Sequence, residues 1–317
     1  MAETLATTYE AIRAAAAWRV VRRDGVLVSG PGALDWLQGQ VSQDLSQLQV
    51  APEAGGASVE TLVLSPQGKI ESSCRVSVVG PDRYLLDVRA GYGEVLFERL
   101  RRFKLRVKAE LETLAGLSAL QVRGPATPQV AELSLRVPAL AVVAVTWPLW
   151  SGLDVLFQGE LDGIEHVEPA VSVGPGDDEA FEAARIEAGV PELGLELTER
   201  TIPQESGELV ARTVSFTKGC YTGQELVARV DARGANTPRR LHGVVITDAV
   251  RPAGGDEILV DGVAVGALTS VAWSPGFAAH VALAAVKRGT ETTHEAQVIG
   301  AGGSARASIR SLPMVSG

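Results

Sequence analysis

The beginning of the chain alternates helical and extended hydrophobic patterns. Residues 9–17 (YEAIRAAAA) and 32–48 (GALDWLQGQVSQDLSQL) place apolar side chains at helical spacing, which predicts two amphipathic helices. Between them, residues 18–30 (WRVVRRDGVLVSG) predict two strands turned at Asp24 and Gly25, because Asp-Gly between apolar runs is typical of a hairpin.

Beyond residue 60, segments with the pattern of strands alternate with helical segments, and from residue 235 on only the pattern of strands occurs. Strands are expected in 60–80 and 83–90 and a helix at 93–103. Another helix is expected in 177–194, where acidic residues stand at the N-terminal end. From residue 235 on, short strands alternate with turn residues, which predicts a small antiparallel barrel or sandwich. The expected fold class is therefore α+β with an all-β C-terminal unit.

The length and the net charge of the chain restrict the classes of function that it can have. A chain of 317 residues is expected to form two or three compact units. Its net charge of -9 repels nucleic acid and anionic membranes at long range, so we expect no direct stable nucleic-acid binding and no membrane partner. No segment has the pattern of a secretory or organelle-targeting peptide or the roughly 20 apolar residues of a membrane span, and we expect a cytoplasmic protein.

The chain contains two cysteines, Cys74 and Cys220, far apart in sequence. They suit a reducing compartment and form no disulfide framework. Because neither HExxH nor paired CxxC motifs occur, no metal site is predicted.

The segment SFTKGCYTGQE holds the most specific candidate chemistry. Thr222 and Glu225 have capping-box spacing, so a helix is expected to begin at about Gly223. Cys220 would then lie at the positive end of the helix dipole, with Lys218 as a nearby cation, and both effects favour a thiolate. The alternative, that Cys220 is a small buried hydrophobic residue, stays open.

These residues resemble a known family. KGCYTGQE is similar to the signature of the bacterial folate-binding proteins called YgfZ, whose eukaryotic relatives act in mitochondrial iron–sulfur cluster assembly. They are related to the aminomethyltransferase, or T-protein, of the glycine cleavage system. Further similar segments occur in the family's order and cover essentially the whole chain: LQGQVSQDL, SPQGKI, RRFKLRVK, RIEAGVPELGLEL and GALTSVAWSPGFAAHVALAAVKR.

The resemblance implies two related α+β subdomains and a C-terminal antiparallel β-barrel around a central cavity that binds tetrahydrofolate or a derivative. The implied domains are an α+β folate-binding core at 1–48 and 117–234, an inserted α+β subdomain at 49–116, and the barrel at 235–317.

The resemblance also implies roles for single residues. Glu187 matches the carboxylate that holds the pterin, and Arg229 matches an arginine lining the cavity, while Tyr221 and Gln224 are expected to shape or contact the site. A carboxylate suits the pterin because it can accept two hydrogen bonds from an amidine-like N–H pair. From the residues alone, a solvated helix position for Glu187 and a surface salt bridge for Arg229 are the simpler interpretations.

One departure from the T-protein concerns catalysis. Ser72 and Ser73 stand where the T-protein carries paired aspartates, and Glu71 should point to the opposite face of the strand from Ser72. Without an ionised acid at this place, aminomethyl transfer is not expected.

The resemblance thus implies a tetrahydrofolate-binding accessory protein for iron–sulfur cluster assembly or repair, including enzymes of tRNA modification, with Cys220 as the functional thiol. Its partners would be iron–sulfur client enzymes or assembly proteins. The alternatives are a tetrahydrofolate-dependent one-carbon transferase or demethylase, and an interaction module that has lost the ligand. The basic run 99–108 could meet a folate tail or RNA phosphates, but a solvated basic face is the favoured interpretation.

Overall fold

The computed structural model of the chain describes residues 2–49, 57–127, 139–159, 170–172, 178–248, 250–290 and 292–314. The helices are α1 (Ala2–Ala14), α2 (Ala33–Gln40), α3 (Gly93–Phe103), α5 (Glu179–Glu187), α6 (Leu209–Thr213) and α7 (Gln224–Ala232), with 3-10 turns η1 (Ser46–Gln49) and η3 (Pro203–Ser206). The first strands are β1 (Ala16–Ser29), β2 (Ser58–Leu64), β3 (Ile70–Gly80), β4 (Arg83–Arg89), β5 (Glu110–Leu114), β6 (Leu117–Arg123), β7 (Ala141–Trp147), β8 (Trp150–Gln158) and β9 (Ala170–Ser172).

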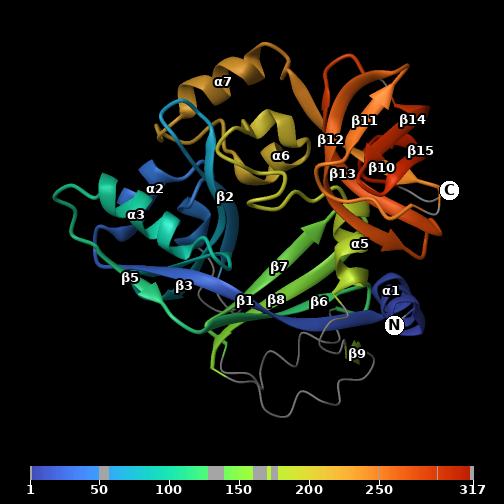
Figure 1. Cartoon of the computed structure of the whole chain (residues 1–317). Coiled ribbons are helices and arrows are strands. Elements are labelled where there is room, and N and C mark those ends of the chain that lie inside the picture. Colours follow the sequence, from blue (N-terminus) through green and yellow to red (C-terminus); the bar gives the residue numbers. More distant parts are fainter. Residues whose placement is uncertain are drawn as a thin grey trace.

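These strands form one sheet, which within the described residues has nine strands. Its order is β2-β3-β4-β1-β6-β8-β7, with β5 and β9 also paired to β1. The long strand β1 joins two halves, because residues 17–22 pair with β6 and residues 23–29 pair with β4 (Figure 1). The sheet is therefore continuous between the expected core and the expected insertion.

The predicted hairpin at Asp24 and Gly25 is wrong, because β1 passes straight through both residues. β4 pairs with this part of β1 on one side and β5 on the other, so the extended backbone is held along both edges. The Asp24 carboxylate accepts hydrogen bonds from the backbone N–H groups of Gly91 and Gly93, each at 2.8 Å. Asp24 therefore fixes the entry to α3 instead of forming a turn.

The other elements of the first half follow the expected pattern more closely. The predicted helix at 93–103 is α3, and its apolar face packs on a cluster that also contains Leu37 and Leu86. The helix expected over 32–48 ends earlier, at Gln40. After it, the backbone bonds to side chains instead: the Gln38 amide oxygen accepts from the N–H of Leu45, at 2.9 Å.

The predicted C-terminal barrel is confirmed. Strands β10 (Arg239–Ile246), β11 (Glu257–Val260), β12 (Val263–Ser274), β13 (Ala279–Lys287), β14 (Thr293–Gly300) and β15 (Gly303–Arg310) close in the order β10-β13-β12-β11-β14-β15. Its interior is filled by small and branched apolar side chains such as Val244, Ala282 and Ile309, so it is a packed core rather than a ligand cavity.

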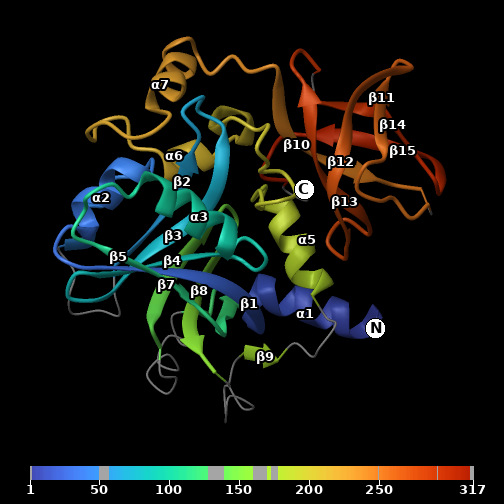
Figure 2. The ribbon, with the colours of Figure 1, turned by 60° about the vertical axis from the view of Figure 1, so that its left-hand side comes forward.

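Helices α1 and α5 connect the sheet to the barrel. Both views show α5 beside the barrel strands and α1 next to α5 (Figures 1 and 2). Ile12 of α1, Phe181 of α5 and Val281 and Leu283 of β13 share one buried cluster. Burial of each such side chain contributes about 1.5–3 kcal/mol, which holds the two parts together.

Candidate functional site

A cavity of about 160 Å³ lies over the sheet where α5, residues 190–193 and α6 approach it. Its lining is dominated by guanidinium groups from seven positions: Arg19, Arg23, Arg75, Arg89, Arg123, Arg185 and Arg212. Four acidic residues also line it: Glu60, Asp154, Glu182 and Glu192. The lining thus carries three more positive than negative charges, although the whole chain is acidic. Guanidinium groups bind carboxylates and phosphates, so this lining is suited to an anionic group even though the protein as a whole repels anions at long range.

Buried aspartates order the arginines on the floor of the cavity. Asp87 accepts from Arg23 and from Arg75, with the shortest N–O distances at 2.6 Å for each. Asp154 accepts from Arg75 at 2.5 Å and from Arg123 at 2.7 Å. Burial alone would raise the pKa of the Asp154 carboxyl, but Arg123 and Arg75 hold it well below its usual range. The aspartates are thus ionised anchors and not proton donors.

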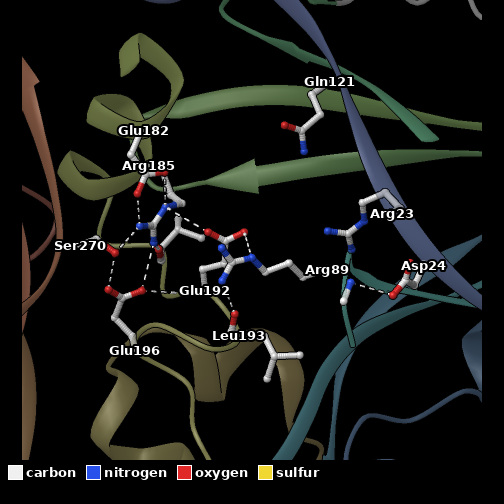
Figure 3. A network of polar contacts seen from close by, with 12 residues as sticks. Arg23, Asp24, Arg89, Gln121, Glu182, Arg185, Glu192, Leu193, Glu196 and Ser270 are labelled. Carbon is white, nitrogen blue, oxygen red and sulfur yellow. Dashed lines mark hydrogen bonds and ion pairs between the residues drawn. The ribbon is translucent and has the colours of Figure 1, made fainter. Parts of the chain in front are cut away.

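A second network lies on the side of the cavity nearest the barrel (Figure 3). Arg89 lies 3.4 Å from Glu192 and donates to the carbonyl oxygen of Leu193 at 2.7 Å. Arg185 donates to Glu182 at 2.5 Å, and its remaining partners are Glu196, Ser270 and the carbonyl oxygen of Val190. Burial raises the pKa of Glu182, but Arg185 more than offsets this and lowers it. Arg185 therefore links α5, the cavity and the barrel strand β12.

Glu192, like Glu60, is a cavity carboxylate with acceptor capacity left. Its ion pairs with Arg89 and Arg185 are long, at 3.4 and 4.0 Å, and its side chain is 32% exposed. Within the described part of the chain its carboxylate accepts no hydrogen bond besides these two ion pairs. It can therefore accept bonds from a ligand's N–H groups.

Glu187, the expected pterin contact, is not in the cavity lining. Its carboxylate accepts from Tyr9 at 2.7 Å and from Ser274 at 2.5 Å, and the residue is 3% exposed. Burial raises the pKa of Glu187, and the two hydrogen bonds lower it by a smaller amount. The pKa of Glu187 is therefore above its usual value. Two residues along a helix point to nearly opposite faces, so Arg185 faces the cavity and Glu187 faces α1 and the barrel. The expected contact of Glu187 with a pterin therefore stays a prediction, and Glu187 does not line this cavity.

The two serines on β3 occupy different environments. Ser73 lines the cavity, whereas Ser72 is buried and its hydroxyl oxygen has no partner within the described residues. Glu71 is not in the cavity lining and pairs with Arg99 of α3. No carboxylate replaces the serines at this position on the strand.

Cys220 lies just before α7, and it is exposed. The predicted helix start is confirmed within one residue, but the predicted cap is wrong: the N-cap is Gly223 in a left-handed conformation, with φ 84°. A side chain at Gly223 would approach the carbonyl oxygen of Ser65 to 2.5 Å, so only glycine fits there. The thiol therefore stands at a helix N-terminus and open to solvent.

Lys218 does not lie free beside the thiol. Its Nζ donates three hydrogen bonds, each 2.8 Å long, to the backbone carbonyl oxygens of Gln38, Val41 and Gln43. These three oxygens are called the carbonyl cradle below. Burial lowers the pKa of Lys218 to about 8, opposed by the charge of Asp44, so the side chain is still a cation at neutral pH.

The remaining predicted site residues surround the Cys220 loop, defined here as residues 215–222. The ring of Tyr221 lies below the Lys218 ammonium, 5.3 Å from its centre, and is buried. Gln224 accepts from the backbone N–H of Tyr221 at 3.4 Å. Arg229 lies on the surface of α7 and pairs with Glu225, as the salt-bridge interpretation anticipated, and it is not in the cavity lining. The structure thus groups Lys218, Tyr221 and Gln224 but separates them from Arg229 and Glu187.

The spacing of charged and polar residues within two strands is a sequence signal for the arginine-lined cavity. Arg19 and Arg23 lie four residues apart on β1, and Ser73 and Arg75 lie two apart on β3, so each pair shares one face of its strand. Basic residues at even spacing inside otherwise apolar strands indicate a charged face buried in the fold.

Comparison with known proteins agrees with this architecture. Residues 239–315 match the family model described as the glycine cleavage T-protein C-terminal barrel domain. The fold is similar to that of the glycine cleavage system aminomethyltransferase T from Bartonella henselae, with a TM-score of 0.77 and 18% sequence identity over 98% of this chain and 90% of that one. The fold is therefore that of the T-protein class, with the T-protein barrel at its C-terminal end.

Within this class, the chain is similar to proteins named tRNA-modifying protein YgfZ. It is 28% identical to that of Klebsiella pneumoniae over 219 residues and 29% identical to that of Edwardsiella ictaluri over 224 residues. Each alignment covers 66% of this chain and 65% of the relative, so the match spans about two thirds of the relatives' length. The resemblance inferred from the motifs is confirmed: the chain is similar in sequence to the YgfZ proteins and in fold to the T-protein.

Two expected absences can be compared with the described residues. No helix among them is long and apolar enough to span a membrane. They also contain no cluster of three or more metal-ligating side chains.

Proposed function

We propose that the protein binds a reduced folate in the arginine-lined cavity and acts as an accessory protein, not as an aminomethyltransferase. The observation that carries the proposal is the positive lining of this cavity in a chain of T-protein fold. The names of the relatives support a role connected with tRNA modification. Support of iron–sulfur enzymes that modify tRNA is the form of this role that an exposed thiol at Cys220 fits.

The residues present fit the chemistry of a folate. The glutamate carboxylates of the ligand match guanidinium groups, which bind carboxylates in a bidentate manner. Arg23 and Arg89 are partly exposed and can offer such donors, and the buried Nε of Arg123 has no acceptor within the described residues. Glu192 is the acceptor for the N–H pair of the pterin. The ligand supplies a one-carbon carrier, and these residues bind and orient it.

The cavity by itself is smaller than the roughly 300–1,000 Å³ of ordinary small-molecule sites. It can enclose one end of a folate, and the rest of the ligand must project from the opening. Arg19 and Arg212, which are 18% and 20% exposed and line the cavity, are available to that projecting part.

Proton transfer to the folate has no evident donor among the lining residues. Asp154 and Glu182 are held ionised by arginines, and Ser73 carries only a hydroxyl at the place of the expected acid. A folate-dependent transferase or demethylase is therefore the weaker alternative, and no contact in the cavity favours it.

Titration calorimetry with tetrahydrofolate tests the proposal. The wild-type protein should bind with measurable heat, and Glu192→Gln should weaken binding by roughly tenfold or more, because the amide has no charge and replaces one of the two acceptor oxygens with an NH2 donor. Glu187→Gln is the matched control, since Glu187 lies outside the cavity, and its affinity should stay within about twofold of wild type.

Absence of heat with the wild-type protein would refute folate binding. Loss of binding in Glu187→Gln together with wild-type binding in Glu192→Gln would show that the motif-based assignment is right and the cavity-based assignment is wrong.

A further inference from the structure

Two segments distant in sequence, residues 38–45 and the Cys220 loop with its preceding residues, are joined by hydrogen bonds. Backbone bonds run from the N–H of Ser215 to the carbonyl oxygen of Ser42, at 3.0 Å, and from the N–H of Thr222 to that of Gly39, at 3.2 Å. Side chains add two more, from Ser42 to the carbonyl oxygen of Thr213 and from Gln43 to that of Arg212. The motifs LQGQVSQDL and KGCYTGQE therefore form one structural unit.

Lys218 lies at the centre of this unit. The residue is 8% exposed, and all three N–H donors of its ammonium are used by the carbonyl cradle. Gln38 belongs to the last turn of α2, where carbonyl oxygens have no partner within the helix and the helix dipole favours a cation. Val41 and Gln43 follow the helix end and turn their carbonyl oxygens to the same point.

Without the ammonium, the convergence of three carbonyl oxygens would be unfavourable. Parallel dipoles would repel one another, and buried acceptors without donors carry a desolvation cost. A neutral apolar side chain cannot satisfy them, and a planar guanidinium presents its donors in a fork that does not match three convergent acceptors.

We propose that Lys218 is a positioning residue: its ammonium closes the carbonyl cradle at the end of α2 and thereby fixes the Cys220 loop, instead of acting on the thiol directly. The importance of that positioning rests on the proposed role of Cys220, whereas the cradle itself rests on the contacts above. The unit also reaches the cavity, because Arg212 joins it through its carbonyl oxygen while its side chain lines the cavity.

Chemical rescue of Lys218→Ala provides the test. A nitroxide label reacts at Cys220, which is exposed, and not at Cys74, which is buried and whose pKa is raised by burial to about 12. The electron paramagnetic resonance spectrum then reports the mobility of the loop. Hydrogen exchange of the Ser215 and Thr222 amides, which bond across the unit, provides a second readout without a label.

Lys218→Ala should sharpen the label's spectrum and speed exchange of both amides by roughly tenfold or more. Propylammonium, which matches the missing atoms and charge, should restore both readouts in a saturable manner. Tetramethylammonium has the charge but no N–H donor, and it should not restore them. Lys218→Arg should resemble Lys218→Ala, not the wild type.

Lys287→Ala is the matched control. Lys287 also donates to a backbone carbonyl oxygen, that of Ala264 at 2.8 Å, but it does so once and at the surface. Its substitution should leave the Cys220 spectrum unchanged. Should Lys218→Ala fail to fold, Lys218→Gln takes its place: it keeps two N–H donors but lacks the charge and the third donor, so the loop should loosen in the same direction, and the amines should not restore it because the glutamine occupies their space.

An unchanged spectrum and unchanged exchange in the Lys218 variant would overturn the proposal, as would equal rescue by tetramethylammonium. Tetrahydrofolate calorimetry on the same samples separates the two proposals. If the amine restores the order of the loop but the protein gives no heat with tetrahydrofolate, the proposal for Lys218 stands and folate binding is refuted.

Discussion

The buried carboxylate of Asp87 provides the sharpest test of how the cavity is built. Asp87 lies on β4, is 0% exposed, and accepts hydrogen bonds from both Arg23 and Arg75. It does not line the cavity but aligns two arginines that do. Asp87→Asn keeps the shape of the side chain but removes its charge. The substitution also replaces one acceptor oxygen with an NH2 group, which then faces the N–H groups of the arginines without an acceptor between them.

The cost of this change follows from burial. Breaking a buried ion pair by neutralising one partner costs about 3–5 kcal/mol, because the other charge is left uncompensated. Arg75 retains Asp154, so the lower end of this range applies, about 3 kcal/mol. With a urea slope of about 1–3 kcal/mol per M, the midpoint of urea unfolding should fall by about 1–3 M. Tryptophan fluorescence measures it, and Trp147, which lies under the Arg123 guanidinium, reports from the cavity.

The effect should also depend on pH in a defined direction. Burial raises the pKa of Asp87, but Arg75 and Arg23 more than offset this and hold it below its usual range. A carboxyl whose folded pKa is depressed contributes stability above its unfolded value of about 3.9 and loses it as the pH falls through the folded value. The difference between wild type and Asp87→Asn should therefore be full at pH 7 and shrink below about pH 4.

The surface pair of Asp248 and Arg306 supplies the control, because Asp248→Asn removes a carboxylate from an exposed ion pair. Its urea midpoint should stay close to that of wild type. An Asp87→Asn protein as stable as wild type at pH 7 would refute the view that Asp87 anchors the cavity arginines. So would a difference that persists undiminished into strong acid.

Two further predictions concern Glu187 and Cys220. Tyr9→Phe removes the hydrogen bond to the buried Glu187 carboxylate and should lower the free energy of unfolding by about 1.5–3 kcal/mol. Urea unfolding measures this change, and a loss below about 0.5 kcal/mol would show that the bond does not hold α1 in place. Cys220→Ser alters an exposed side chain and should leave the unfolding midpoint unchanged. In cells that lack the protein, however, it should fail to restore iron–sulfur enzyme activity, and full restoration would contradict the role of the thiol.

Local patterns predicted the elements that local physics controls. The strand at 83–90, the helix at 93–103 and the C-terminal barrel follow from apolar spacing and turn residues, and they occur as expected. The start of α7 was predicted within one residue from the spacing of Thr222 and Glu225, although the structure caps the helix with Gly223 and not with the Thr222 side chain.

The hairpin prediction failed for a nonlocal reason. Asp24 and Gly25 have turn chemistry, but β4 and β5 lie on both sides of this segment and keep it extended. Strand pairing across 60 or more residues outweighs a local turn preference of the kind that decides isolated hairpins. The domain bounds inferred from the family resemblance stay a prediction.

The sequence by itself determined the fold class, the similarity to the YgfZ proteins and a cysteine shortly before a helix, because these depend on short-range spacing and on contiguous motifs, whereas the structure decided that this cysteine is exposed. Only the tertiary structure decided which charged side chains meet. It placed the Lys218 ammonium among carbonyl oxygens of another segment, directed Glu187 to Tyr9 and Ser274, and gathered seven arginines at the cavity from four strands and two helices. The physical reason is that electrostatic partners are selected by proximity in space, and proximity between distant segments arises only when the sheet and its helices have packed.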